Sequence, residues 1–398
     1  MHIFMLVSAY QEKGYANTGA ELQAETQLRQ LKAKGHKITI ISKKRTFKSK
    51  FYEVIDGVEV FRVWPPSLRT LETLSLLFLA RNKCDIVHIH GQHLFSVAAI
   101  GLCRLLGIPS VLKITIAGRF FVRLSADRIF PRKWRPLRRL LNYVSQKASA
   151  YLAISKEISE QMPQIGFLPE RIHLIPNGVN MGRFHPVASS EQRLLREQLG
   201  LPTDKQILLY ASRLMYRKGV DLLIAAWPLI HANCPEACLV VVGGGSLTEV
   251  EKLKKLKKTG EDSIIYAGEV QDTAPYLQCS DVFIFPSRKE GLPNALLEAM
   301  ACGVACIASD IGGCNELIQP DKTGILFASG DSTALSKAAV SLLCNQQKIQ
   351  EIGIQAYHHI QAKYNILMVT DQINGLYTTL HKKVSVQGVK SDSGLCSR

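Results

Sequence analysis

Short runs of apolar residues alternate with segments of helical period along the whole chain. The apolar runs are nearly continuous in Val, Ile and Leu, which is typical of parallel strands covered by helices on both faces. Because strand and helix alternate in this way twice, the sequence predicts an α/β fold with two doubly wound, Rossmann-like domains. The expected strands are 3–8, 37–42, 59–63, 85–90, 111–116 and 150–154, then 207–212, 237–242, 264–267, 282–286 and 304–309. The expected helices are 20–34, 94–106, 136–149, 220–232, 247–258, 295–302, 334–344 and 346–363.

Proline and glycine residues interrupt the pattern around 177–190, and this break separates the two predicted domains, 1–180 and 181–363. The polar, Ser- and Gly-containing end, 382–398, is expected to be a frayed, flexible tail. Ligands of doubly wound sheets bind at the carboxyl ends of the strands, so the default site is a cleft that the two domains face.

Composition narrows the class of protein. The chain has 398 residues, 46% hydrophobic and 21% charged, which is typical of folded domains with sizeable cores. No apolar run reaches the length of a transmembrane helix, and the first residues resemble a buried strand more than a signal peptide, so a cytoplasmic location is expected. The ten cysteines are scattered without a C-x-x-C pair, which favours buried free thiols over structural zinc or disulfides.

The net charge of +16 is concentrated in one half of the chain. Residues 1–180 contain 27 Lys and Arg against 12 Asp and Glu, and the rest is nearly neutral. Basic residues with interleaved aromatics at 119–139, and a second basic run at 43–50, suit an anionic lipid surface. Single-stranded nucleic acid could use the same residues, and an ordinary charged surface is an equally good interpretation.

The segment 283–300 is the first candidate for chemistry. A buried strand leads into a polar loop and then a helix, for which Asn294 is the expected N-cap, and the free amides that follow would suit a phosphate. Glu290 in the loop and Glu298 in the helix suit sugar hydroxyls on either side of a diphosphate. A solvated loop with a surface glutamate is the simpler alternative.

Three other strand-to-helix turns carry candidate residues. Arg213 and Lys218 lie in YASRLMYRKGV and could neutralise a departing diphosphate, although ordinary surface basicity explains them equally well. VVGGGS would let the backbone approach a ligand through Gly243 and Gly244. The turn that contains Gly19 resembles a phosphate-cradling loop, but it lacks G-x-G-x-x-G, which argues against a nicotinamide dinucleotide.

Taken together, Glu290-x7-Glu298, SRLMYRKG, IPNGVN and EAMACGVACIASDIGG resemble the retaining glycosyltransferases of family 4, which have the GT-B fold. The resemblance covers almost the whole chain. It implies that 1–180 binds the acceptor, that 181–363 binds a nucleotide-sugar donor, and that a C-terminal helix, 364–381, packs back on the N-terminal domain.

The resemblance also implies roles for individual residues. Glu298 would bind the ribose, Glu290 would contact the donor sugar, and Arg213 and Lys218 would hold the diphosphate; Glu290, Arg213 and Lys218 form the expected catalytic set. The remaining donor-binding positions are mostly backbone contacts with the phosphates, the sugar or the base. They are Gly19, Gly243, Gly244, Val270, Gly291, Asn294, Ala295 and Leu296.

The sequence departs from the family pattern at several points. Thr18-Gly19 replaces a common Gly-Gly, Asn180 replaces a common Asp, and no histidine occurs in KITIAG (113–118). No D-x-D occurs, so fixed cations and a helix N-terminus are expected to replace a divalent metal, and no cofactor is expected. The resemblance implies retention by a front-face path, in which the departing phosphate accepts the proton of the acceptor.

A rival interpretation rests on His88-x-His90-x-Gln92-His93, which resembles the H-x-H-x-D-H motif of binuclear metallohydrolases. The family resemblance instead assigns His90 and His93 to the acceptor side. A basic membrane- or nucleic-acid-binding module is a further alternative. The leading hypothesis is a glycosyltransferase with a lipid-linked or saccharide acceptor in cell-surface polysaccharide or glycolipid synthesis, with no nucleic-acid partner and peripheral contact with the inner face of the cytoplasmic membrane.

Overall fold

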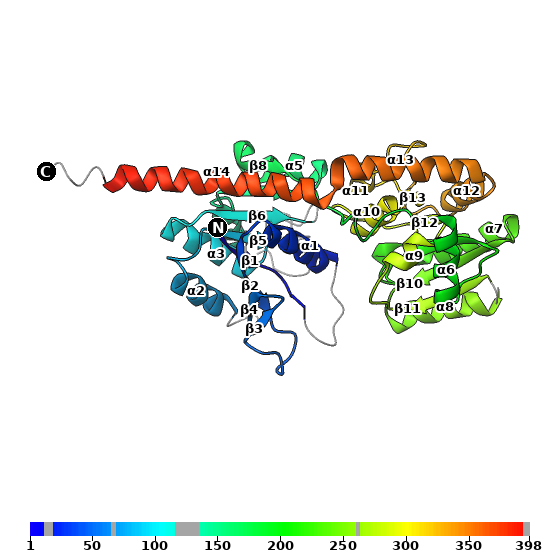
Figure 1. Cartoon of the computed structure of the whole chain (residues 1–398), viewed down its shortest axis with the longest axis horizontal. Helices are drawn as coiled ribbons and strands as arrows, with labels where there is room; N and C mark the ends of the chain where they lie inside the picture. The colour runs from blue at the N-terminus through cyan, green and yellow to red at the C-terminus, as the bar shows by residue number, and fades with distance from the viewer. Residues whose placement is uncertain (12–18, 65–68, 116–134, 260–262, 393–398) are drawn as a thin grey trace. The chain divides into compact units, whose positions relative to one another are not determined.

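The computed structural model describes residues 1–11, 19–64, 69–115, 135–259 and 263–392. The chain divides into two compact units (Figure 1). Unit 1 comprises Met1–Gly178 and Ile366–Arg398, and unit 2 comprises Val179–Asn365. Each unit contains a largely parallel sheet with helices packed against it, which confirms the predicted α/β class with two doubly wound domains.

The sheet of unit 1 has eight strands in the order β3-β4-β2-β1-β5-β6-β7-β8. All neighbouring strands are parallel except β3 and β4, which form an antiparallel pair at one edge. The strands are β1 (His2–Leu6), β2 (Lys37–Lys43), β3 (Tyr52–Ile55), β4 (Val58–Val63), β5 (Ile86–His90), β6 (Ser110–Ile114), β7 (Ala150–Ala153) and β8 (Ile172–Leu174).

Two helices from opposite ends of the sequence cover one face of this sheet. Leu28 of α1 (Gly19–Ala33) and Tyr377 of α14 (Ile366–Asp392) share a buried core with Met5 and Val111 of the strands. The other helices of unit 1 are α2 (Arg69–Leu79), α3 (Leu94–Leu106), α4 (Arg135–Ser145) and α5 (Lys156–Gln161). Because α14 continues to Asp392, the prediction of a flexible tail from residue 382 is wrong over 382–392.

The sheet of unit 2 has six parallel strands in the order β11-β10-β9-β12-β13-β14. The strands are β9 (Gln206–Ala211), β10 (Ala237–Val242), β11 (Ile264–Gly268), β12 (Val282–Phe285), β13 (Ala305–Ser309) and β14 (Ile325–Phe327). The helices are α6 (Ser189–Leu199), α7 (Val220–Asn233), α8 (Leu247–Thr259), α9 (Ala274–Gln278), α10 (Asn294–Ala301), α11 (Gly312–Asn315), α12 (Ser332–Leu343) and α13 (Gln346–Tyr364).

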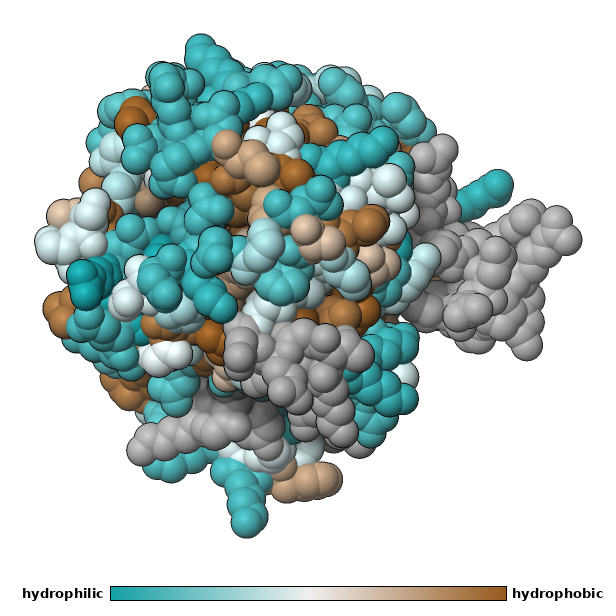
Figure 2. Space-filling view, turned by 90° about the vertical axis from the view of Figure 1, so that its right-hand side faces the viewer, coloured by the Kyte–Doolittle hydropathy of each residue, from teal (hydrophilic) through white to brown (hydrophobic). Residues whose placement is uncertain are grey.

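Burial follows the hydropathy pattern. All six residues of β10 are buried, as expected for a strand covered on both faces. The face drawn in Figure 2 is mostly hydrophilic, with hydrophobic residues in small separate areas. The strands that the sequence analysis missed are β3, whose residues are exposed or half-buried, and the three-residue strands β8 and β14, which are too short to give a periodic signal.

All nine described cysteines are free and eight of them are buried, in agreement with the predicted free thiols. Among the described residues, no helix combines the length and apolar character that a membrane crossing requires.

Candidate active site

The strand order of unit 2 reverses direction between β9 and β12. In doubly wound sheets, ligands bind beside the carboxyl ends of the strands at such a reversal. The loop after β9 leads through a short 3-10 helix, Tyr216–Lys218, into α7, and the loop after β12 leads into α10. These are the loops that carry Arg213, Lys218 and Glu290.

Glu290 is the centre of a compact polar cluster formed by the segments that follow β9 and β12. Its Oε1 atom accepts hydrogen bonds from Lys218 Nζ at 2.6 Å, from Ser287 Oγ at 2.6 Å and from Arg217 Nη1 at 3.3 Å. Only 12% of the Glu290 side chain and 16% of the Lys218 side chain are exposed, so water screens the ion pair little. Two of the three predicted catalytic residues are therefore in direct contact.

A second ion pair joins the loop after β12 to the first turn of α7. Arg288 donates two hydrogen bonds of 2.7 Å to the carboxylate of Asp221, and its guanidinium lies 3.9 Å from the ring centroid of Tyr216. The backbone N–H of Arg288 donates to the carbonyl of Arg217. The hydroxyl of Ser287, which donates to Glu290, also lies 3.2 Å from that carbonyl. The sequence analysis missed a set of polar residues, because the type of a polar residue does not reveal which distant residue it contacts. They are Arg217, Asp221, Ser287 and Arg288.

Backbone contact between the loops depends on glycine. A Cβ atom on Gly219, which has φ of 72°, would lie 1.9 Å from the carbonyl oxygen of Pro286. A Cβ atom on Gly243 would lie 2.0 Å from the carbonyl oxygen of Ser212. Glycine is therefore required where the turns after β9, β10 and β12 approach one another. Gly244 follows in the same turn, and Gly291 is buried in the loop before α10.

Arg213 differs from the other two predicted catalytic residues. Its side chain is exposed and makes no contact with Glu290 or Lys218 within the described parts of the chain, while its carbonyl accepts a hydrogen bond from the hydroxyl of Tyr210. The structure thus leaves the guanidinium on the surface of the loop that carries Lys218.

Glu298 lies on α10 in a different electrostatic environment. Burial is the main cause that raises the pKa of its carboxyl to about 7, while the nearby charges of Arg183 and Asp272 act in opposite directions. Arg183 Nη2 lies 2.8 Å from Oδ1 of Asp272, which belongs to the loop between β11 and α9. Val270 lies in the same loop and is partly buried. A buried carboxyl with a raised pKa is typical of functional sites, although structural ion pairs also shift pKa values.

The start of α10 differs from the prediction by one residue. The helix begins at Asn294, and Pro293 occupies the N-cap position with no side-chain cap, so the prediction that Asn294 is the N-cap is wrong. The first amides of the helix lack acceptors within the helix. Ala295 is partly buried there, and the side chain of Leu296 lies in the core, so any contact of Leu296 with a ligand would be through its backbone.

In unit 1 the strand order reverses between β1 and β5. His90 is the last residue of β5, and His93 is the N-cap residue of α3, so both lie at the carboxyl edge of the sheet at this reversal. Gly19 is the exposed first residue of α1. Residues 12–18, and residues 119–134 of the basic stretch 119–139, lie outside the described residues.

The histidines of the motif do not assemble a metal centre. Nδ1 of His88 lies 2.5 Å from the hydroxyl of Tyr377, and Gln92 donates to the hydroxyl of Ser145 at 3.0 Å. Burial lowers the pKa of His88 to about 3 and that of His90 well below its usual value. Within the described ranges, no three His, Cys, Asp or Glu residues are grouped as metal ligands.

Lys113 is a buried cation that the sequence analysis did not single out. It pairs with His90 in the register of β5 and β6, its side chain is almost fully buried, and burial lowers its pKa to about 8. Lys113 therefore adds to the electrostatic field that disfavours protonation of the two histidines.

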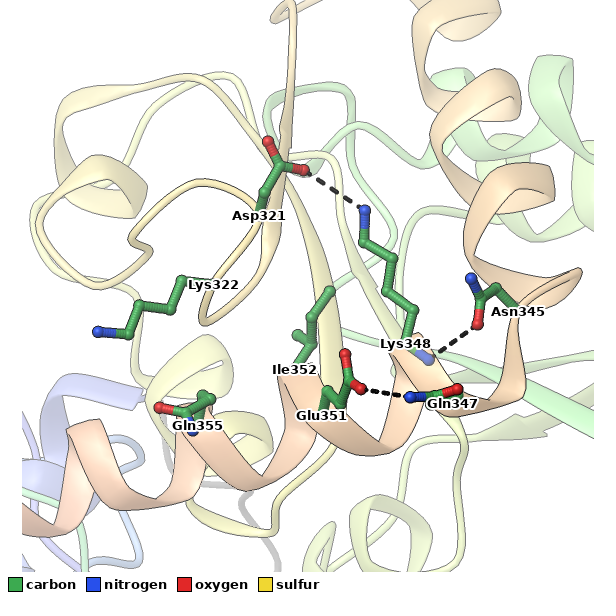
Figure 3. Close-up of a pocket in the computed structure, with 8 residues that line it drawn as sticks. All are labelled: Asp321, Lys322, Asn345, Gln347, Lys348, Glu351, Ile352 and Gln355. Atoms are coloured by element: carbon green, nitrogen blue, oxygen red, sulfur yellow. Dashed lines mark hydrogen bonds and ion pairs between the residues drawn. The ribbon is translucent and has the colours of Figure 1, made fainter.

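A pocket of about 760 Å³ lies elsewhere in unit 2, against α13 (Figure 3). It contains none of the predicted site residues, and its basic and acidic side chains balance, with Lys348 and Asp321 3.7 Å apart. The pocket therefore gives no preference for an anionic nucleotide. Its lining residues are Asp321, Lys322, Asn345, Gln347, Lys348, Glu351, Ile352 and Gln355.

Comparison with known proteins agrees with the fold. Residues 17–183 match the family described as Glycosyltransferase Family 4, and residues 205–345 match the family described as Glycosyl transferases group 1. The fold and these matches define an enzyme of the glycosyltransferase class with the GT-B fold. The chain belongs to the family 4 type of these glycosyltransferases.

Individual relatives support the same assignment. The chain is 25% identical to N-acetyl-alpha-D-glucosaminyl L-malate synthase of Bacillus anthracis, over 91% of this chain and 94% of the relative. It is 28% identical to UDP-Gal:alpha-D-GlcNAc-diphosphoundecaprenol alpha-1,3-galactosyltransferase of Escherichia coli, over 78% and 80% of the two chains. The structure of Anabaena HepE in complex with UDP-glucose is similar with a TM-score of 0.76 at 19% identity, covering 95% of this chain and 100% of HepE.

These comparisons confirm the predicted family and the glycosyltransferase activity, and they give no support to the metallohydrolase alternative. The roles assigned to individual residues stay predictions.

Proposed function

We propose that this enzyme transfers a sugar, with retention of configuration, from a nucleoside-diphosphate sugar to a lipid-linked or saccharide acceptor in cell-surface polysaccharide or glycolipid synthesis. The observation that carries the proposal is the Glu290–Lys218–Ser287 cluster beside the strand reversal of unit 2. The name of the Escherichia coli relative contains both a UDP-sugar and a diphosphoundecaprenol-linked acceptor, and HepE was crystallised with UDP-glucose.

The donor would be held by charges of both signs. Lys218 and Arg213 would bind the diphosphate, and the amides of Asn294, Ala295 and Leu296 would add partial positive charge. All three hydrogen bonds of Glu290 go to Oε1, so Oε2 has no partner among the described residues and suits a sugar hydroxyl. The carboxyl of Glu298 suits the ribose hydroxyls, and Val270 would border the base. Gly19, Gly243, Gly244 and Gly291 would allow close backbone approach.

In the proposed reaction, Lys218 and Arg213 stabilise the negative charge that develops on the departing diphosphate, without a metal ion or other cofactor. The acceptor hydroxyl attacks the anomeric carbon from the face that the diphosphate leaves, and a phosphate oxygen accepts its proton. This front-face path comes from the family resemblance. It requires no protein nucleophile, and activity should persist in the presence of a chelator.

Nucleotide binding tests the donor site directly. UDP, GDP and ADP are titrated against the full chain while the Tm is measured, and one of them should raise it. Glu298→Ala and Arg213→Ala should each weaken that stabilisation. Lys289→Ala, which alters an exposed side chain in the loop that carries Glu290, should not. A wild-type protein that none of the three nucleotides stabilises would contradict the proposal.

The acceptor would bind at the carboxyl edge of the sheet in unit 1, near His90 and His93. We also propose that unit 1 contacts an anionic membrane surface on the cytoplasmic side. Among the described residues, the side chain of Phe47 in the basic run 43–50 is 88% exposed. Its ring contacts the ring of Trp64, and Nζ of Lys44 lies 5.3 Å from the centre of that Trp64 ring. An exposed aromatic ring among lysines is typical of an anionic lipid interface.

Vesicle sedimentation tests this contact. The protein should bind phosphatidylglycerol vesicles, less so as salt increases, and should not bind phosphatidylcholine vesicles. Phe47→Ser should reduce binding several-fold, whereas Leu194→Ser, which changes an exposed side chain of unit 2, should not. Equal binding by wild type and Phe47→Ser would exclude a role for this ring.

A further inference from the structure

Cys234 and Cys344 are 110 residues apart in sequence, yet their Sγ atoms lie 3.9 Å apart. Cys234 is the C-cap residue of α7, and Cys344 is the C-cap residue of α12. The two helices belong to the same unit and share one buried core, to which Trp227 and Ala339 contribute (Figure 1). Neither cysteine takes part in the candidate active site.

The geometry favours a bond between the two sulfur atoms. A disulfide has a length of about 2 Å, so the sulfurs need to approach by only about 2 Å. Both cysteines continue the hydrogen bonding of their helix ends, because the N–H of Cys234 donates to the carbonyl of Ile230 and the N–H of Cys344 donates to the carbonyl of Val340. Rotation of the two side chains is therefore the movement that the bond requires.

The two thiols differ in access. Cys344 is exposed, and it is the only exposed cysteine in the described ranges. Cys234 is 9% exposed. Burial, and to a smaller extent the neighbouring Cys344, raises the pKa of the Cys234 thiol to about 11. An oxidant in solution therefore meets Cys344 first, and Cys234 is in position to react with the product.

We propose that Cys234 and Cys344 form a reversible disulfide when the enzyme meets a small-molecule disulfide such as oxidised glutathione. The Cys344 thiolate attacks one sulfur of this oxidant, releases one small thiol and forms a mixed disulfide. The Cys234 thiolate then attacks Sγ of Cys344 and displaces the second small thiol. The two protons lost by the cysteines go to the two released thiolates, and the two electrons reduce the oxidant.

The bond would join the ends of two helices that pack on the sheet of unit 2. It would close a loop that contains β10 to β14, so it would restrict the unfolded chain strongly. Because neither sulfur lies near Glu290 or Glu298 in sequence or in a contact, the bond should stabilise the scaffold of the donor site without altering the site. The expected result is a higher Tm for the oxidised enzyme, with unchanged nucleotide affinity.

The test uses the full chain, treated under native conditions with oxidised glutathione. Thiol titration should show the loss of two thiols per chain, and peptide mass mapping without reductant should find Cys234 linked to Cys344. The Tm of the oxidised protein should be higher than that of the reduced protein, and dithiothreitol should reverse the difference.

Single variants separate the two steps. Cys234→Ser should stop at the mixed disulfide on Cys344, and Cys344→Ser should gain neither the mixed disulfide nor the link. Cys279→Ser, which changes a buried cysteine outside the pair, should behave as the wild type. A wild-type protein that keeps the mixed disulfide without forming the link, or that forms the link only after denaturation, would overturn the proposal. A linked protein with an unchanged or lower Tm would also overturn it.

Discussion

Lys218 Nζ lies 2.6 Å from Glu290 Oε1, and this ion pair joins the loop after β9 to the loop after β12. The pair lies where the strand order of unit 2 reverses, so the fold itself brings together two residues that are 72 positions apart. The lysine orients the carboxylate through Oε1, and Oε2 has no partner among the described residues. In the proposed reaction, the carboxylate would hold the lysine in one position before the donor arrives, which is the preorganisation that electrostatic catalysis needs.

We predict that Glu290→Gln and Lys218→Met each lower kcat/KM for sugar transfer by about 100-fold, because each removes one half of a preorganised charge pair. Steady-state kinetics with the nucleotide sugar that binds best measures this effect. Glu351→Gln, an exposed glutamate of unit 2, should leave kcat/KM unchanged.

The double variant sharpens this prediction. If the pair acts as one unit, Glu290→Gln combined with Lys218→Met should lose little more activity than either single variant. Losses that multiply would show that the two residues act independently.

Arg288 is predicted to position the loop rather than to touch the donor. Arg288→Lys loses the paired hydrogen bonds to Asp221 and the guanidinium above Tyr216, and a lysine cannot replace this geometry. We expect donor KM to rise about five- to tenfold, with a smaller change in kcat and a Tm close to that of the wild type. Kinetics and thermal unfolding measured together test this. Lys289→Ala is the neighbouring control, and a large loss of kcat with unchanged KM would assign Arg288 a different role.

The sequence predicts strands and helices well where a strand is fully buried or a helix buries one apolar face. The expected bounds of the strand 237–242 and the helix 94–106 agree with β10 and α3. It predicts less well where an element is short or exposed, because hydrophobic periodicity then carries little information. The bounds of α14 show the opposite error, since a polar end was interpreted as a tail although it continues a helix.

The sequence did not predict which side chains of the site contact one another. Glu290, Lys218 and Glu298 were predicted site residues from the strand-to-helix segments that contain them. Nothing in the sequence indicates that Ser287 and Arg217 also bind Glu290. The same holds for Arg288 and Asp221, and for Tyr377 beside His88, because such contacts depend on how distant segments pack.

Tyr377→Phe should destabilise unit 1 without affecting the donor site. Two hydrogen-bond donors face Nδ1 of His88, namely the hydroxyl of Tyr377 and the side-chain amide of Gln27. Nδ1 of the neutral ring therefore accepts. Loss of the Tyr377 hydroxyl leaves this buried acceptor poorly satisfied, which costs about 1–3 kcal/mol of unfolding free energy. Urea unfolding measures the loss. Tyr143→Phe, at an exposed tyrosine, is the control, and equal stability of both variants would contradict the prediction.

Glu298 makes the stability of the enzyme depend on pH. Burial raises the pKa of its carboxyl from 4.5 to about 7, so the folded state binds the proton more tightly than the unfolded state does. Stability should therefore fall as pH rises from 4.5 to about 7, by up to about 3 kcal/mol, and should then level off. Glu298→Gln removes this dependence, so the stability of the variant relative to wild type should rise across the same interval. Thermal or urea unfolding from pH 4.5 to pH 8 gives the difference curve.

Nucleotide affinity should also depend on the titration of Glu298, but it should rise with pH where the stability falls. Ribose hydroxyls donate to an ionised carboxylate better than to a protonated one, so the affinity of wild type for its nucleotide should increase as pH rises through about 7. Glu298→Gln should bind the nucleotide more weakly than wild type at high pH, and its affinity should not show this increase. Subtracting the pH curve of the variant from that of wild type removes the contribution of other groups that titrate in the same range. Calorimetric titration of both proteins across this range measures the difference. Parallel pH curves for wild type and Glu298→Gln would show that this carboxyl does not contact the nucleotide.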